Sequence, residues 1–243
     1  MPRYFHPALE DEIIGLAGDE AHHALRVRRV RVGEIVSLFD GNGGEAVGVV
    51  SEVSRSALQV LVHQRFVAAE PTGRRLTLAV AVPKGERGDW MIEKAAELGV
   101  VAVWPLLTAR GVVRPGLGRL AKWRRMTIES NKQSGRSRLM EICEPLDIDE
   151  ALRRFAQFAR VWLASPDAAD SSDASAMVAD SFQSQADLAL IGPEGGWEES
   201  ERACLVNGGA RPLRLGPHIL RVETAAVAAA AVWAFRRRAP HRD

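Results

Sequence analysis

Short apolar runs alternate with small polar turns in the first part of the chain. Residues 35–39, 46–53 and 58–62 are apolar or alternating. They are separated by the turn 40–44, Asp-Gly-Asn-Gly-Gly, and by Ser54-Arg55-Ser56. Turns of this length and composition connect antiparallel strands. The pattern predicts a small β-barrel built from hairpins.

The pattern changes after the segment 69–73, Ala-Glu-Pro-Thr-Gly, where longer apolar runs begin to alternate with helical spacing. We expect strands at residues 76–82, 100–106, 161–164, 188–191 and 213–215, and helices near 86–98, 117–132, 174–181, after Trp197 and at 223–238. Such alternation predicts an α/β fold with a parallel sheet covered on both faces. We therefore place one domain at 1–70 and a second at 71–243.

Composition narrows the class of protein. The chain has 243 residues, of which 47% are hydrophobic, enough for a packed core. It contains no apolar run of membrane-spanning length, and its first residues lack the apolar segment of a secretory signal. We expect a cytoplasmic protein without a membrane partner. Cys143 and Cys204 have neither the spacing of a zinc site nor that of a disulfide framework, so no metal is expected.

The net charge of +1 hides an uneven distribution. Arginines and lysines crowd residues 110–138, where Glu129 is the sole acid, and a second basic cluster lies at Arg26, Arg28, Arg29 and Arg31. Such clusters bind a phosphate backbone by releasing counterions. A solvated helix face is the alternative interpretation.

Two loops follow predicted strands, at the edge where parallel sheets bind ligands. The first, residues 191–196 with the sequence Ile-Gly-Pro-Glu-Gly-Gly, precedes Trp197 and an acidic helix start. Its glycines let the backbone approach a ligand closely, whereas the nearby acids and the missing phosphate-loop patterns argue against a phosphate ligand. A tight structural turn is the alternative.

The second loop, residues 215–225, reads Leu-Gly-Pro-His-Ile-Leu-Arg-Val-Glu-Thr-Ala and leads into an alanine-rich helix. Glu223 or Thr224 could cap that helix. Capping does not account for Arg221.

These two loops resemble the signature loops of the RsmE family, bacterial methyltransferases that act on ring nitrogen three of a uridine in 16S ribosomal RNA. Other segments agree with the family in the expected order: Met1-Pro2-Arg3-Tyr4-Phe5, residues 22–33, residues 38–41, Lys84, residues 93–100, and residues 129–136 ending in Lys-Gln-Ser-Gly-Arg. The resemblance spans nearly the whole chain. Arg28, Gly111, His218 and Val222 depart from the usual pattern, and the last two lie in the second loop.

The resemblance implies a PUA-like β-barrel followed by a SPOUT methyltransferase domain with a C-terminal trefoil knot. It also implies a homodimer, S-adenosylmethionine as the cofactor, and 16S ribosomal RNA within the small ribosomal subunit as the partner. The implied cofactor-binding residues are Leu163, Ala164, Ser165, Ile191, Gly192, Pro193, Glu194, Gly195, Gly196, Leu215, Gly216, Pro217, His218, Ile219 and Leu220.

Methylation of a uracil nitrogen requires that its proton leave. We hypothesise that Arg136 or Arg221 stabilises negative charge on the uracil carbonyls and that Glu194 or Glu223 accepts the proton. Each has a plainer interpretation: Glu194 shapes its turn, Glu223 caps its helix, and Arg136 binds phosphate. The residues expected to bind RNA are Arg3, His22, Arg26, Arg29, Arg110, Arg124, Arg125, Lys132, Gln133 and Arg136.

Three other functions stay open. A related enzyme could methylate a ribose hydroxyl or another base with the same cofactor pocket. An RNA-binding or ribosome-assembly protein could keep the fold without transfer activity, although the intact glycine loop and Arg221 disfavour this. A nicotinamide or nucleotide-triphosphate enzyme is disfavoured by the absence of both phosphate-loop patterns.

Overall fold

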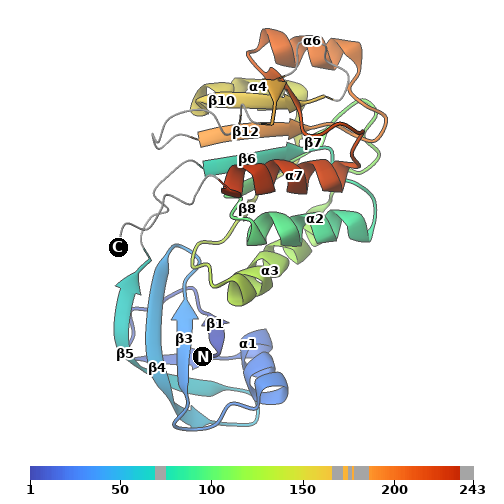
Figure 1. The fold of residues 1–243 in the computed structure, drawn as a ribbon. Helices are drawn as coiled ribbons and strands as arrows, with labels where there is room; N and C mark the ends of the chain where they lie inside the picture. The colour runs from blue at the N-terminus through green and yellow to red at the C-terminus, as the bar shows by residue number, and fades with distance from the viewer. Residues whose placement is uncertain (69–74, 166–171, 175–176, 178–185, 236–243) are drawn as a thin grey trace. The chain divides into compact units, whose positions relative to one another are not determined.

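The computed structural model describes residues 1–68, 75–165, 172–174, 177 and 186–235, and its chain divides into two compact units (Figure 1). The first unit comprises Met1–Glu70 and Asn131–Leu139, and the second comprises Pro71–Ser130 and Met140–Asp243. The domain boundary expected after residue 70 falls among residues outside the described ranges. The sequence pattern did not indicate that Asn131–Leu139 groups with the first unit.

The first unit is built on a curled sheet, blue to cyan in Figure 1, with the strand order β1-β3-β4-β5-β2. Its strands are β1 (Arg3–Phe5), β2 (Ile13–Leu16), β3 (Ile35–Phe39), β4 (Gly44–Val53) and β5 (Leu58–Val67). Antiparallel pairing of β3 with β4 and of β4 with β5 confirms the predicted hairpins. Strands β1 and β2, helix α1 (Gly18–His22) and the π-helical turn His23–Arg28 are too short for the pattern to reveal.

The turn between β3 and β4 forms because of its particular residues. One carboxylate oxygen of Asp40 accepts hydrogen bonds from the backbone N–H groups of Asn42, at 2.6 Å, and Gly44, at 2.8 Å. Gly41 and Gly43 have φ angles of 82° and 102°, in the left-handed region that glycine tolerates at little cost. The alternating strands then bury one face around Tyr4, Leu38 and neighbouring apolar residues.

The second unit contains parallel strands in the order β11-β13-β10-β12-β6-β7-β8, with β9 paired to β7. Their bounds are β6 (Arg75–Val80), β7 (Ala102–Leu107), β8 (Glu141–Ile142), β9 (Leu146–Asp147), β10 (Arg160–Ala164), β11 (Ser172–Asp173), β12 (Ala186–Ile191) and β13 (Arg211–Arg214). The helices are α2 (Glu86–Glu97), α3 (Leu117–Ser134), α4 (Ile148–Arg153), α6 (Glu199–Asn207) and α7 (Val222–Phe235), with a 3-10 turn at Phe155–Gln157. The helix expected at 174–181 lies almost wholly outside the described residues, as do Arg236, Arg237 and Arg238.

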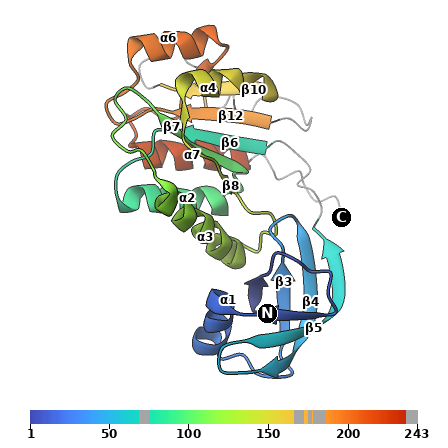
Figure 2. The same cartoon turned by 180° about the vertical axis from the view of Figure 1, so that it is seen from behind.

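Helices cover both faces of this sheet, as the sequence predicts. Figures 1 and 2 show α2 and α7 on one face and α4 on the other. Alternate residues of each strand enter two separate cores: in β12, Ala189 and Ile191 face α2 and α7, whereas Leu188 and Leu190 face α4. Within the described ranges, no helix is both long enough and apolar enough to cross a membrane.

The strand register fixes where the site forms. Leu163 of β10 lies beside Leu190 of β12, and Ala164 of β10 lies beside Leu213 of β13. The three strands therefore end together, and the loops that follow them meet at one edge of the sheet.

Candidate active site

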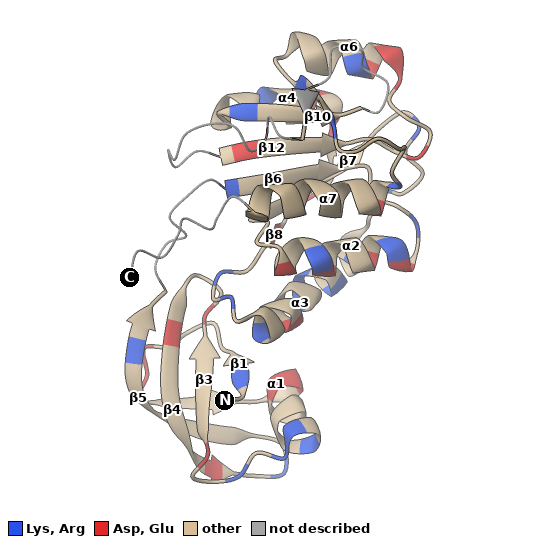
Figure 3. Cartoon of the chain, viewed as in Figure 1, with Lys and Arg blue, Asp and Glu red and all other residues tan. Residues whose placement is uncertain are grey.

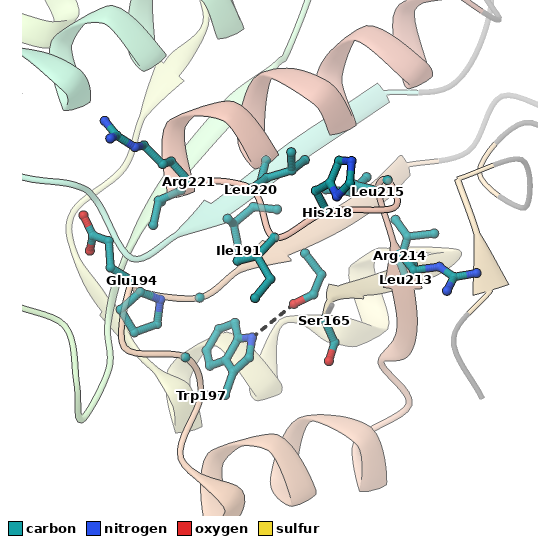
Figure 4. A pocket seen from close by; sticks show the side chains of 18 of the residues that line it. Ser165, Ile191, Glu194, Trp197, Leu213, Arg214, Leu215, His218, Leu220 and Arg221 are labelled. Atoms are coloured by element: carbon teal, nitrogen blue, oxygen red, sulfur yellow. Dashed lines mark hydrogen bonds between the residues drawn. The ribbon is translucent and has the colours of Figure 1, made fainter. Parts of the chain in front are cut away.

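A cavity of about 460 Å³ lies at the carboxyl ends of β10, β12 and β13 (Figure 4). Its volume is within the range of about 300–1,000 Å³ that small-molecule sites occupy. The loops after the three strands and the first turn of α7 supply its walls. The lining residues are Ala164, Ser165, Ile191, Gly192, Pro193, Glu194, Gly195, Gly196, Trp197, Leu213, Arg214, Leu215, Gly216, His218, Ile219, Leu220, Arg221, Val222 and Ala225.

Most residues expected to bind the cofactor line this cavity, but Leu163 and Pro217 do not. Leu163 is fully buried, and its side chain enters the core on the α4 face because side chains alternate along β10. Pro217 is exposed beside the cavity. His218 and Val222, where the chain departs from the RsmE pattern, both line it.

Four lining residues were not predicted, namely Trp197, Leu213, Arg214 and Ala225. Trp197 carried a usable signal, because it directly follows the glycine loop. Its indole N–H donates a hydrogen bond to the carbonyl of Ala164 at 3.4 Å, which links two of the three loops (Figure 4).

Gly192 is required by the close approach of Trp197. A Cβ atom at residue 192 would lie 2.8 Å from two atoms of the indole ring, Cε2 and Nε1. Gly196 adopts a φ angle of 72°, and its N–H donates to the carbonyl of Pro193 at 2.9 Å. The glycines thus shape the wall of the cavity through packing and through backbone conformation.

We expect Gly192→Ala to weaken cofactor binding about fivefold to a hundredfold, because the indole that lines the cavity must shift and overpacking of this kind costs about 1–3 kcal/mol. Isothermal titration with S-adenosylmethionine measures the effect. Gly195→Ala is the matched control in the same loop, since its Cβ would meet Arg110 at an ordinary 3.4 Å. Equal losses in both variants would contradict this explanation.

The two candidate proton acceptors occupy different surroundings. Glu194 lines the cavity, and its side chain is 42% exposed. Glu223 does not line it; its side chain is 9% exposed, and within the described residues its Oε2 atom has no hydrogen-bond partner. In the view of Figure 4, Glu194 and Arg221 project at the same edge of the cavity, opposite Arg214.

Arg87, in the first turn of α2, reaches both acids. Its guanidinium nitrogens lie 3.6 Å from Glu194 Oε1 and 3.8 Å from Glu223 Oε1. The sequence analysis did not select Arg87. It could have been found from topology, because α2 follows β6, whose carboxyl end lies beside that of β12.

Arg110, expected to bind RNA, supports the glycine loop. Its guanidinium donates a hydrogen bond to the carbonyl of Gly195 at 2.9 Å, and its Nε lies 4.0 Å from Glu198 Oε1. The basic segment therefore supports the wall of the cavity at this residue, although Arg110 itself does not line it.

Several other basic residues of the segment are engaged within the second unit. Lys122 and Arg119 lie 2.6 and 3.7 Å from carboxylate oxygens of Asp89. Burial raises the pKa of Asp89, but hydrogen bonds from Lys122 and Trp123 and the two positive charges outweigh it, and the pKa falls below its usual value. Arg124 donates to the carbonyl of Ile142 and to Glu144, both at 3.1 Å.

Arg125 differs from these neighbours. It is exposed, and within the part of the chain that the structure describes it makes no ion pair or side-chain hydrogen bond. It is therefore the residue on this helix whose charge is most available to a ligand.

The RNA-binding candidates of the first unit fall into two groups. His22, Arg26, Arg29 and Gln133 are exposed, and Arg136 is partly buried. Figure 3 shows the acidic start of α1 in red and, in blue, arginines of the π-helical turn His23–Arg28 that continues it. Arg3 and Lys132 are instead held in ion pairs with Glu45 and Glu20.

Among the described residues, no group of three or more histidine, cysteine, aspartate or glutamate side chains could hold a metal ion. Cys143 and Cys204 are free thiols. Burial raises the pKa of Cys143 to about 12, so this thiol is protonated near neutral pH.

Comparison with known proteins places the chain in a family. Residues 70–234 match the model of an RNA methyltransferase domain, and residues 16–62 match that of an RNA methyltransferase PUA domain. The chain is 34% identical over 221 residues to ribosomal RNA small subunit methyltransferase E of Mycobacterium bovis, covering 87% of this chain and 82% of the relative. The chain belongs to the RsmE family.

Other RsmE proteins agree over almost the full length. The Bacillus subtilis enzyme is 27% identical over 237 residues, which is 93% of each chain. The crystal structure of the Neisseria gonorrhoeae enzyme, bound to S-adenosylmethionine, superposes with a TM-score of 0.84 at 29% identity and covers 95% of both chains. The expected α/β methyltransferase fold with an N-terminal PUA domain is thereby confirmed.

Proposed function

We propose that this chain uses S-adenosylmethionine to methylate ring nitrogen three of a specific uridine in 16S ribosomal RNA of the small subunit. The observation that carries the proposal is the glycine-lined cavity at the joined ends of β10, β12 and β13 in a chain of the RsmE family. An enzyme with this substrate works where ribosomes are assembled, in the cytoplasm.

The residues of the cavity fit the cofactor. Ile191, Leu215, Ile219 and Leu220 would provide apolar contacts for the adenine ring, and the backbone at Gly192, Gly195 and Gly196 is accessible because glycines carry no side chain. Trp197 closes one wall of the cavity, and its indole ring lies 2.8 Å from the position that a Cβ of residue 192 would occupy. When bound, S-adenosylmethionine supplies an electrophilic methyl group on a sulfonium.

The chain itself must orient the uracil and take up its proton. Arg221 lines the cavity, where its guanidinium would stabilise negative charge on the uracil carbonyls. Glu194 also lines the cavity, and its side chain is half exposed. We therefore assign to Glu194 the role of the base that accepts the uracil proton, directly or through water. Glu223 is buried, does not line the cavity and faces Arg87. We therefore propose that Glu223 holds the Arg87 side chain in place. Arg136, in the first unit, is assigned to RNA binding.

We also propose the homodimer and the C-terminal trefoil knot, both on the resemblance to the family. Light scattering of the purified chain measures the subunit number.

Arg125→Gln is expected to weaken RNA binding more than Arg124→Gln does. Arg124 already neutralises Glu144, whereas Arg125 has no such partner among the described residues. Loss of one phosphate contact flattens the dependence of log K on log salt by roughly 0.7–0.9. Anisotropy titrations of ribosomal RNA at several salt concentrations measure the slope, and S-adenosylmethionine affinity serves as the control. An unchanged slope in both variants would refute the role of this helix face.

The decisive experiment is transfer of a labelled methyl group to small subunits and to naked RNA, both from a strain lacking the enzyme, followed by identification of the modified nucleoside. We expect 3-methyluridine. A methylated ribose or another methylated base would support the related-enzyme alternative. Failure to bind S-adenosylmethionine in calorimetry would support an RNA-binding protein without transfer activity.

A further inference from the structure

The segment Asn131–Leu139 is attached to the turn between β3 and β4 through the backbone. The N–H of Leu139 donates to the carbonyl of Gly41 at 2.9 Å, and the N–H of Gly43 donates to the carbonyl of Ser137 at 3.2 Å. Arg138 forms β-bridges with Gly41 and Asn42. A Cβ on Gly41 would lie 2.8 Å from a side-chain methyl of Leu139, and the φ angle of 82° at Gly41 favours glycine in this turn.

Arg3 fastens the same segment through its side chain. One guanidinium nitrogen, Nη2, donates to Ser137 Oγ at 2.8 Å, to the carbonyl of Arg136 at 3.2 Å and to Glu45 Oε1 at 3.1 Å. The hydroxyl of Ser137 also donates to Glu45. The guanidinium lies 4.8 Å from the centre of the Phe39 ring. The side chains of Arg3 and Glu45 are only 13% and 20% exposed, so the positive charge of Arg3 is largely shielded from solvent.

A second attachment holds the start of the segment. Lys132 Nζ lies 2.5 Å from Glu20 Oε1, with side-chain exposures of 8% and 16%. The other carboxylate oxygen of Glu20 accepts a hydrogen bond from the backbone N–H of Phe5 at 3.2 Å. Glu20 thereby links Lys132 to β1, the strand that also carries Arg3.

Between the two attachments lies the part of the segment that faces solvent. Gln133, Ser134 and Gly135 are exposed, and Gly135 turns the chain with a φ angle of 75°. Arg136 follows, with its carbonyl held by Arg3. Both ends of this turn are therefore fixed by acids and by an arginine of the first unit.

We propose that Arg3, Glu20 and Glu45 are positioning residues that hold Gln133 and Arg136 in the conformation that binds RNA, without contacting RNA themselves. The inference rests on the proposed function, in which this turn binds ribosomal RNA. It changes the role expected for Arg3 and Lys132 from phosphate contacts to structural ion pairs.

Glu20 and Glu45 allow a test in which the direction of the change in RNA affinity distinguishes a positioning role from a purely electrostatic one. Removing a carboxylate near a polyanion strengthens binding if charge alone matters. In a positioning role, the same removal weakens binding because the turn loses its fixed ends. We expect Glu45→Gln and Glu20→Gln each to raise the Kd for small-subunit RNA about fivefold to thirtyfold. The charge-matched control is Glu52→Gln, an exposed acid of β4 in the same unit, which should leave Kd unchanged or lower it.

Arg3 provides a second readout. Lys keeps the charge, but its shorter side chain does not extend to the position of Nη2 and lacks the planar group that lies over the Phe39 ring, so Arg3→Lys should weaken binding as much as Arg3→Gln does. Neither variant should change the salt slope. Rescue by Arg3→Lys, together with a flatter slope in Arg3→Gln, would show a direct phosphate contact and overturn the proposal.

All variants are tested in the full chain, with thermal unfolding and S-adenosylmethionine calorimetry in parallel. Ser137→Ala, which removes one acceptor and no charge, replaces any variant that does not fold and should weaken RNA binding. Tighter RNA binding by Glu45→Gln and Glu20→Gln would reject this inference while leaving the proposed function intact. Absence of RNA binding and methyl transfer in the unaltered chain would instead reject the proposed function.

Discussion

Glu194→Gln is expected to lower the rate of methyl transfer about 10²-fold to 10⁴-fold at saturating S-adenosylmethionine, the usual contribution of a positioned general base. Glu194 lines the cavity, whereas Glu223 is buried outside its lining. Glu223→Gln should therefore have a smaller effect, about tenfold, exerted through Arg87. Single-turnover transfer to small subunits from a strain lacking the enzyme measures both rates.

The pair of variants is matched, because both substitutions are isosteric and both acids face Arg87. Full activity in both would eliminate the acid-base proposal. A larger loss in Glu223→Gln than in Glu194→Gln would transfer the role of base to Glu223. Calorimetry with S-adenosylmethionine shows whether either change acts through cofactor binding.

Asp187→Ala is expected to destabilise the second unit by about 3–5 kcal/mol, because it removes the carboxylate that pairs with a buried guanidinium. Asp187 of β12 and Arg160 of β10 are register neighbours. They form a two-pronged ion pair at 2.9 and 3.2 Å, with side-chain exposures of 0% and 6%. Urea unfolding followed by circular dichroism measures the loss.

Two comparisons isolate the cause. Glu144→Ala breaks the exposed pair with Arg124 and should cost about 0–1 kcal/mol. The double change Arg160→Met with Asp187→Leu removes both charges and should recover much of the stability lost in Asp187→Ala. A double variant as unstable as the single one would show that packing of the side chains, rather than the broken ion pair, is responsible.

The loops that line the cavity can be predicted from the sequence, whereas Arg87, which pairs with Glu194 and Glu223, was not recognised in this way. The loops 191–196 and 215–221 were found because strands of a parallel sheet end at a common edge, a rule that needs only the positions of the strands. Arg87 obeys the same rule through β6 but was missed, since a single arginine at a helix start carries no local signal. Leu163 was included although side-chain alternation along β10 turns it away.

The sequence by itself determined the elements, because periodicity, turn glycines and apolar runs act within a few residues of one another. It predicted β3, β4, the start of β5, the parallel strands β6, β7, β10, β12 and β13, and helices α2, α3 and α7. Strand β5 was expected to end at residue 62 but continues to Val67. The resemblance of several motifs in order identified the family. Very short elements such as β1, β2, β8 and β9 contain too few residues for a period to be recognised.

Only the tertiary structure decided which charges are available to ligands. Arg3 and Lys132 read as basic residues suited to RNA, but they meet Glu45 and Glu20, partners far away in the sequence, in surroundings that exclude most solvent. The same packing groups Asn131–Leu139 with the first unit, although Asn131–Ser134 is the last turn of α3, a helix that begins in the second. Burial and ion pairing depend on which distant segments come together, and the pattern of residues within one segment carries no information about its distant partners.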